Sequence, residues 1–524
     1  MRILTNAHIH TLNPLQPSVN ALAIEGGKII AVGDAETLLS LASAQIEIEN
    51  MGGKYILPGF CDAHIHLLEY GRSLSKINCE TGTRQECLQR IRSKCEHSQP
   101  GEWILGHGWN HNVWPEGLGN ASLLDKISQQ HPIYLSAKSL HLSWVNSAAL
   151  HLAGITNETP DPNGGHIERD ISGKPTGILY ETASNLVENF IPEPGLEKNI
   201  ADIQIAQTNL LSYGITSVHD FDTWDCYLAL KIMEERGCLR LHVSKGIPRQ
   251  KLQEIINTGL CTGMGSDQLR IGPLKLFIDG ALGSQTAAML QSYQGTQSSG
   301  MLLMDADELL EIGKQAVSNG INLAVHAIGD RANRVALDGY EKLRDFENMN
   351  NLAPGRHRIE HVQLIQPSDQ VRMSTLNIIA SMQPIHAASD RDMAEQYWGS
   401  RCQNAYAWKS LDNAGVNIIF GSDAPVENPN PFWGIFAAVT RQQLNENDQS
   451  SWRDEQCLTL EQALSAYTIG TGFISGIEDQ AGTLAIGHSA DLIILEQDIF
   501  TLQPEQMIKM RPSLVMQKGE WVRF

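Results

Sequence analysis

The chain has 524 residues, of which 42% are hydrophobic and 19% are charged, as in a folded globular protein of enzyme size. Its net charge of −20 argues against nucleic acid or an anionic membrane as a partner, and no apolar run is long enough to span a bilayer. The nine cysteines form no Cys-x-x-Cys pair, and polar residues follow the N-terminus too soon for a signal peptide. We therefore expect a cytoplasmic protein.

Alternating apolar residues at both ends of the chain predict β-strands. Near the start, Ala21–Ile24 and Lys28–Val32 flank a glycine turn, and Asp491–Leu495 has a similar pattern near the end. Two β-rich ends around a long middle predict one small β-sandwich, built from residues 1–57 together with 482–524.

The middle of the chain, residues 58–481, alternates strand and helix patterns, which predicts an α/β fold of parallel βαβ units. Eight runs are expected to be the strands of a (β/α)₈ barrel: Tyr55–Leu57, Ile215–Val218, Leu239–Val243, Leu274–Ile278, Ile321–Val325, Arg358–Ile359, Ile378–Ala380 and Val416–Phe420. A ninth candidate, Pro132–Leu135, has no place in a closed barrel. We assign it to a large insertion after barrel strand 1, about residues 68–197, expected to lie over the active site.

His64 and His66 follow a Pro-Gly break and would point to the same face of an extended strand, which suits a divalent metal. Barrel enzymes keep their active sites at the carboxyl ends of the strands. Further polar residues on or just after predicted strands are Lys275, His326, His361 and Asp423. The sequence therefore predicts a metal site there. A second pair, His8-x-His10, lies in the terminal β region and is interpreted as structural.

The motifs around these residues resemble the amidohydrolase superfamily. More narrowly, they resemble the YtcJ-like branch of the amidohydrolase-3 group, which includes N-substituted formamide deformylases. The matching segments are Pro58–His66, Gly214–Val218, Lys275–Gly280, His326–Asp330, Glu360–Gln363, Gly421–Pro425 and Gly482–Leu492. The resemblance covers nearly the whole chain and implies a metal-dependent hydrolase.

The resemblance also implies one or two divalent metal ions, usually zinc. The more buried ion would be held by His64, His66 and Asp423, and the other by His326 and His361. Lys275 would bridge them as a carbamate, because an ammonium group has no lone pair with which to bind a metal. The alternative is that Lys275 forms a buried ion pair with Asp279.

This ligand set implies hydrolysis by a metal-activated hydroxide, with Asp423 as the general base that passes the proton to the leaving amine. The expected reaction cleaves a non-peptide C–N bond in an amide, N-formyl or related small molecule. Two alternatives stay open: a deaminase or cyclic-imide hydrolase using the same site, and a non-catalytic metal-binding or regulatory protein. Assembly into a homo-oligomer is also left open.

Six residues are candidates for substrate contacts: Trp109, His111, His141, His219, Asp220 and His386. Trp109 and His141 lie in the insertion, where lining a pocket is slightly favoured over packing in the core. His219 and Asp220 follow the second predicted strand, where support of the metal ligands is as well founded as catalysis. His386 follows the seventh strand and is expected at the rim of the barrel.

Overall fold

The computed structural model describes residues 1–40, 46–111, 113–137, 142–444, 450–469, 472 and 481–523. The chain divides into two compact units. One consists of Met1–Gly71 together with Ile203–Phe524, and the other is Arg72–Asp202. No helix in the described part of the chain combines the length and the apolar character needed to cross a membrane.

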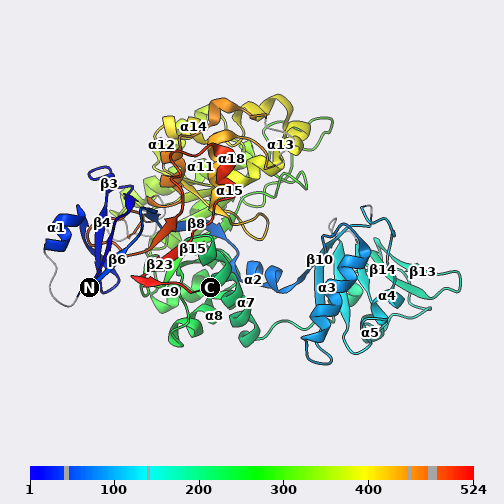
Figure 1. Ribbon diagram of the computed structural model, residues 1–524. Coiled ribbons are helices and arrows are strands. Elements are labelled where there is room, and N and C mark those ends of the chain that lie inside the picture. Colours follow the sequence, from blue (N-terminus) through cyan, green and yellow to red (C-terminus); the bar gives the residue numbers. More distant parts are fainter. Residues whose placement is uncertain are drawn as a thin grey trace. The chain divides into compact units, whose positions relative to one another are not determined.

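The predicted eight-stranded parallel barrel is confirmed in the first unit, where it is nearly closed (Figure 1). Neighbouring strands run parallel in the order β8 (Phe60–Ile65), β15 (Ile215–Asp220), β16 (His242–Pro248), β17 (Leu269–Phe277), β18 (Leu323–Ala327), β19 (Arg358–His361), β20 (Ile379–Met382) and β21 (Ile418–Phe420). At the carboxyl ends of β8 and β21, the amide of Asp423 donates to the carbonyl oxygen of His64 at 2.7 Å. This contact brings the first and last strands of the barrel together.

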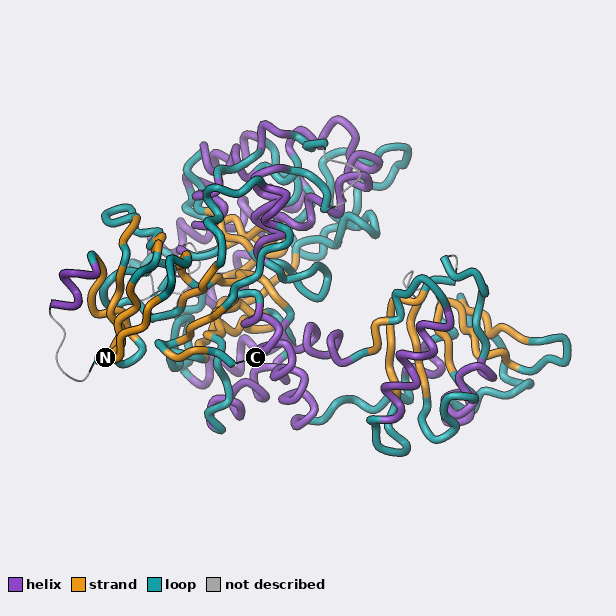
Figure 2. Tube along the Cα trace, in the orientation of Figure 1, coloured by secondary structure: helices purple, strands orange, loops and turns teal. Residues whose placement is uncertain are grey.

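Helices flank the barrel strands (Figure 2). They are α2 (Leu67–Ser75), α7 (Leu196–Ser212), α8 (Trp224–Glu235), α9 (Leu252–Thr258), α10 (Ala306–Val317), α11 (Asp330–Met349), α12 (Pro367–Thr375), α13 (Pro384–Trp398), α14 (Trp408–Asn413), α15 (Pro431–Thr440) and α16 (Leu460–Ala466). In α11 the buried side chains include Ala332, Ala336 and Tyr340, which recur every fourth residue and so share one face. Strands covered in this way are buried on both faces, as β8 is along its whole length.

Our assignment of Tyr55–Leu57 to the first barrel strand is wrong. These residues belong to β7 (Tyr55–Pro58), which pairs antiparallel with β22 (Leu492–Leu495) near the other end of the chain. Two largely buried strands follow one another here, and Gly59 separates them. A Cβ atom at Gly59 would lie 2.4 Å from the Thr216 hydroxyl, so the close approach of β15 requires glycine at this break. The true first strand begins at Phe60.

Strands from both chain ends form two further sheets in the first unit. One has the order β24 (Glu520–Trp521), β23 (Leu514–Gln517), β22, β7, β2 (His8–His10) and β3 (Ser18–Val19). The other has the order β5 (Lys28–Gly33), β4 (Ala21–Glu25), β1 (Arg2–Thr5) and β6 (Glu47–Asn50), with α1 (Ala35–Ser40) after β5. Leu22, Ile56 and Leu492 belong to one buried cluster that draws on both sheets. The composite β-sandwich and its boundaries stay predictions.

The second unit lies in sequence between β8 and β15, as expected of the insertion. Its sheet has the order β13 (Gly165–Arg169), β14 (Pro175–Glu181), β12 (Leu142–Val145), β11 (Ile133–Ala137), β10 (Ile104–Trp109) and β9 (Ile77–Asn78). Its helices include α3 (Arg84–Glu96), α4 (Ala121–Asp125), α5 (Ser147–Leu152) and α6 (Asn185–Glu188). The ninth strand candidate is β11, inside this sheet. Trp109, Trp114 and Trp144 pack together in the unit's core.

Candidate metal centre

Three side chains from distant parts of the sequence meet at the carboxyl ends of the barrel strands. His64 lies on β8, His361 ends β19 and Asp423 follows β21. One possible ligand atom from each lies within 4.8 Å of those of the other two. All three residues are buried. A compact set of imidazole nitrogens and one carboxylate is a donor set that fits zinc and similar divalent metals.

The backbone at two of these residues is strained. His361 has a φ of 75° and Asp423 a φ of 60°, in the left-handed region that residues other than glycine seldom adopt. Such conformations persist where the surroundings fix them. At Asp423 the preceding residue, Ser422, donates from its amide to Asp62 at 3.0 Å. The strands therefore end in geometry that holds these side chains at the cluster.

His64 is oriented by a buried carboxylate. Its Nδ1 atom donates to Glu360 at 2.6 Å, which leaves Nε2 directed at Asp423, 3.5 Å away. Burial lowers the pKa of His64 to about 4, so the ring is neutral at pH 7. Burial raises the pKa of Glu360, but the charge of Arg358 outweighs this and holds that pKa well below its usual range. A charged carboxylate thus fixes the tautomer that offers a lone pair to a metal.

His66 lies between two carboxylates. Its Nε2 atom is 3.3 Å from Asp423, and its Nδ1 atom is 3.5 Å from Asp222. Burial alone lowers the pKa of His66, but hydrogen bonding to both carboxylates raises it to about 10. The carboxylates around His66 therefore stabilise positive charge, and the same carboxylates would stabilise a bound cation.

Lys275 brings its amine to the same place. The Nζ atom lies 3.4 Å from Nε2 of His64, and burial lowers the pKa of Lys275 to about 8. The alternative partner, Asp279, accepts hydrogen bonds from the amides of Ala288, Ile328 and Gly329 at 2.8 to 3.0 Å. Through these contacts the Asp279 carboxylate holds the loop at Ala288 and the loop at Ile328–Gly329 in place. They weaken the case for an ion pair with Lys275.

The remaining two histidines are each held through one ring nitrogen. His326 is 3.0 Å from the carbonyl oxygen of Gly280 through Nε2, and His361 is 2.9 Å from Gln383 through Nδ1. Their ring centroids lie 4.6 Å apart, and those of His361 and His64 lie 4.9 Å apart. In each ring, one nitrogen thus forms a hydrogen bond with a neighbouring residue outside the cluster. Metal-binding histidines are commonly held in this way.

Three of the substrate-contact candidates lie around the cluster. His386 is 3.5 Å from Asp423, and hydrogen bonding to that carboxylate outweighs burial and raises the pKa of His386 to about 10. His219 lies 2.8 Å from the guanidinium of Arg358, which links it to the centre through the Arg358–Glu360 ion pair. Asp220 pairs with Lys245 at 2.9 Å and accepts from the amide at the start of α2. Their roles in substrate binding stay predictions.

The other candidates belong to the insertion. Trp109 is fully buried there and donates from Nε1 to the carbonyl oxygen of Leu135 at 2.8 Å, as in the core-packing alternative. His111 lies near it, with ring centroids 6.0 Å apart. His141 lies outside the described residues. In the terminal sheet, His10 pairs with Asp498 at 3.2 Å, far along the chain from the barrel ligands.

Sequence reasoning missed the residues that hold the ligands in place, chiefly Glu360, Asp222 and Gln383. For Glu360 a signal was present. Arg358 and Glu360 are opposite charges two residues apart in a short buried strand, so they share one face and must pair. Their atoms lie 2.6 Å apart.

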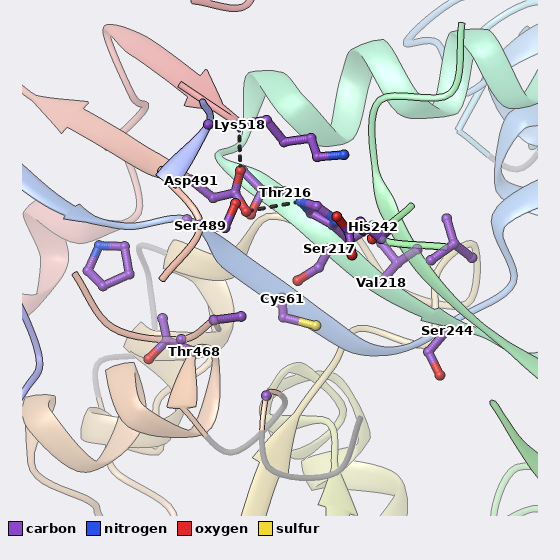
Figure 3. A pocket seen from close by; sticks show the side chains of 18 of the residues that line it. Cys61, Thr216, Ser217, Val218, His242, Ser244, Thr468, Ser489, Asp491 and Lys518 are labelled. Carbon is purple, nitrogen blue, oxygen red and sulfur yellow. Dashed lines mark hydrogen bonds and ion pairs between the residues drawn. The ribbon is translucent and has the colours of Figure 1, made fainter. Parts of the chain in front are cut away.

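A further cavity lies at the opposite ends of the strands (Figure 3). It is lined by residues near the start of β8, β15 and β16, such as Cys61, Thr216 and His242. The carboxyl-end cluster of His64, His361 and Asp423 does not line it.

A sequence model described as the amidohydrolase family matches residues 47–523, nearly the whole chain. The chain belongs to the amidohydrolase family. This amidohydrolase is 30% identical to the YtcJ protein of Bacillus subtilis (strain 168), over 95% of both chains. It is 27% identical to an N-substituted formamide deformylase of Arthrobacter pascens, over 95% of this chain and 93% of the relative. The resemblance seen in the motifs is thus confirmed.

A crystal structure of an uncharacterized metal-dependent hydrolase from Pyrococcus furiosus has the same fold. It superimposes with a TM-score of 0.77 at 29% identity, covering 96% of this amidohydrolase and 99% of the other chain. Family and fold together make this amidohydrolase a hydrolase that acts on C–N bonds.

Proposed function

We propose that this amidohydrolase cleaves the amide bond of N-substituted formamides or closely related non-peptide amides, with a divalent metal, zinc, at the carboxyl ends of the barrel strands. The observation that carries the proposal is the buried meeting of His64, His361 and Asp423. The N-substituted formamide deformylase among the relatives supports the choice of bond.

The donors would be shared between one or two ions. His64, His66 and Asp423 would hold the more buried ion, and His326 and His361 the other. Lys275 would bridge them after its neutral amine adds carbon dioxide, forming a carbamate and releasing a proton. The lowered pKa of Lys275 makes that amine available near neutral pH. Bound metal supplies Lewis-acid polarisation and activates water for attack.

The chain's own groups handle the protons. The Asp423 carboxylate takes the proton from the attacking water and delivers it to the leaving amine nitrogen, so that formate and an amine are released. His386, 3.5 Å from Oδ2 of Asp423, positions that carboxylate. Glu360 and Asp222 hold His64 and His66 in place.

The test is a panel of C–N substrates offered to zinc-replete protein: N-formyl amines, N-acyl amino acids and cyclic ureides. The proposal expects formate from N-formyl amines at the highest kcat/KM. Ammonia release or ring opening at a higher kcat/KM would instead support a deaminase or cyclic-imide hydrolase. Full metal occupancy without turnover of any member would favour the non-catalytic, metal-binding alternative.

A further inference from the structure

A second, open cavity of about 280 Å³ lies beside Lys275, at the carboxyl ends of β15, β16 and β17. Because the Lys275 amine is 3.4 Å from His64, this cavity adjoins the candidate metal centre. The rings of Phe221 and Phe277 lie 4.5 and 5.2 Å from the same amine. A substrate whose carbonyl group is at the metal centre therefore has an aromatic-walled space next to it.

The wall of this cavity is apolar and is held by the backbone. The amide of Leu303 donates to the carbonyl oxygen of Ile278 at 2.7 Å, which fixes the Leu303–Met304 wall against the end of β17. Met304 is buried, whereas Leu303 is 54% exposed and Phe277 47% exposed. Two large apolar side chains left open on one cavity are typical of a ligand-binding surface.

The charges of the cavity do not suit an anionic group. Among its described lining residues the cations are Lys275, which belongs to the metal centre, and Arg249, which pairs with Glu308 at 2.6 Å. Asp222 adds a carboxylate. A carboxylate on the substrate would lose hydration here without gaining a free cation, whereas an alkyl or aryl group would gain from leaving water.

We propose that this cavity is the subsite for the substituent on the substrate nitrogen, and that it selects neutral apolar substituents over those that carry a carboxylate. The inference rests on the proposed function. The carbonyl carbon of a formamide bears only hydrogen, so the nitrogen substituent is the part of the substrate that can fill the cavity.

The test measures kcat/KM for N-methyl-, N-butyl- and N-hexylformamide and for N-formyl-β-alanine, with zinc-replete protein. We expect kcat/KM to rise about fourfold for each added methylene group that leaves water. N-formyl-β-alanine, which is close to the butyl compound in length, should be about tenfold poorer or worse than it.

Two variants locate the effect. Phe277→Ala and Leu303→Ala should each lower the hexyl-to-methyl ratio of kcat/KM about fivefold. The ratio cancels any common loss of rate caused by the contact between Phe277 and His326, and Leu303→Ala serves if Phe277→Ala does not fold. The matched control is Leu228→Ala on α8, where a side chain of similar exposure, 46%, lies away from the cavity. That variant should keep the ratio.

A flat series in the wild type, or an unchanged ratio in both cavity variants while formamides are still hydrolysed, would overturn this inference and leave the proposed function standing. Failure to hydrolyse any formamide would overturn both.

Discussion

His64 on β8 donates a hydrogen bond to Glu360 on β19 at 2.6 Å, and both side chains are almost completely buried. The same carboxylate pairs with Arg358 at 2.6 Å. Glu360 thus has two tasks: it orients a proposed metal ligand and it neutralises a buried guanidinium.

The variant Glu360→Gln tests both tasks, each with its own measurement. We expect zinc affinity to fall about 10- to 100-fold, because His64 loses the charged acceptor that fixes its tautomer. Stability should also fall, by about 3 kcal/mol, because Arg358 is left buried without its counter-charge. Competition with a chelator measures the first effect and thermal unfolding the second.

The matched control is Glu347→Gln. Glu347 is also buried and pairs with Arg344 at 2.7 Å and His357 at 3.1 Å, away from the cluster. It should lose stability and keep its zinc affinity. Equal zinc affinity in both variants would remove Glu360 from the account of the metal centre.

Asp423→Asn tests the proton transfer. The amide keeps the size of the side chain and one oxygen, but it cannot accept the proton from water. We expect kcat to fall about 10²- to 10⁴-fold with the fold retained. Asp338→Asn, which only disturbs an outer ion pair with Arg372, is the control and should keep its turnover. Near-normal kcat in Asp423→Asn would rule out Asp423 as the base.

Lys275 should carry carbon dioxide. Protein prepared with isotope-labelled bicarbonate is expected to show one carbamate resonance by NMR, and Lys275→Met should lack it. Activity should fall when bicarbonate is excluded during metal loading and return when it is added. A fully active wild type without the resonance would leave Lys275 as an amine at the site.

The ion pair between His242 on β16 and Asp491 should make stability depend on pH (Figure 3). Burial alone lowers the pKa of His242, but the Asp491 carboxylate outweighs it and raises that pKa above its ordinary value. The unfolded chain loses its proton near pH 6.5, before the folded protein does. The stabilisation is therefore complete below about pH 6.5 and is lost as the pH rises through the raised pKa.

Asp491→Asn reveals this dependence. The melting temperature of the variant should lie further below that of the wild type at about pH 6 than at about pH 9. A difference that stays constant over this range would mean that the pair does not titrate there.

The barrel could be predicted because its apolar strands alternate with amphipathic helices, and chemistry-bearing residues such as His361 and Asp423 stand where those strands end. The prediction misplaces the first strand because the apolar run of β7 lies directly before β8, with only Gly59 between them. Two pairings assign β7 to the terminal sheet: Leu57 pairs with Ile493, more than four hundred residues away in sequence, and Ile56 pairs with Ile9 on β2. Local pattern carries no such information.

Distance in sequence also hid the residues that support the ligands. Glu360 meets His64 across 296 residues, and Asp222 meets His66 only because β8 and β15 are neighbours. Trp109, by contrast, is recognised in the sequence, but its role is left open. A tryptophan on a glycine-rich segment fits either a pocket or a core until its burial is known.

The most direct test of a metal-dependent hydrolase is to strip the protein with a chelator and titrate zinc back, following bound metal and formate release from an N-alkylformamide in the same samples. We predict that the stripped protein is inactive and that turnover rises with bound zinc up to one or two ions per chain. Metal-free protein that hydrolyses the substrate at the full rate would contradict the account.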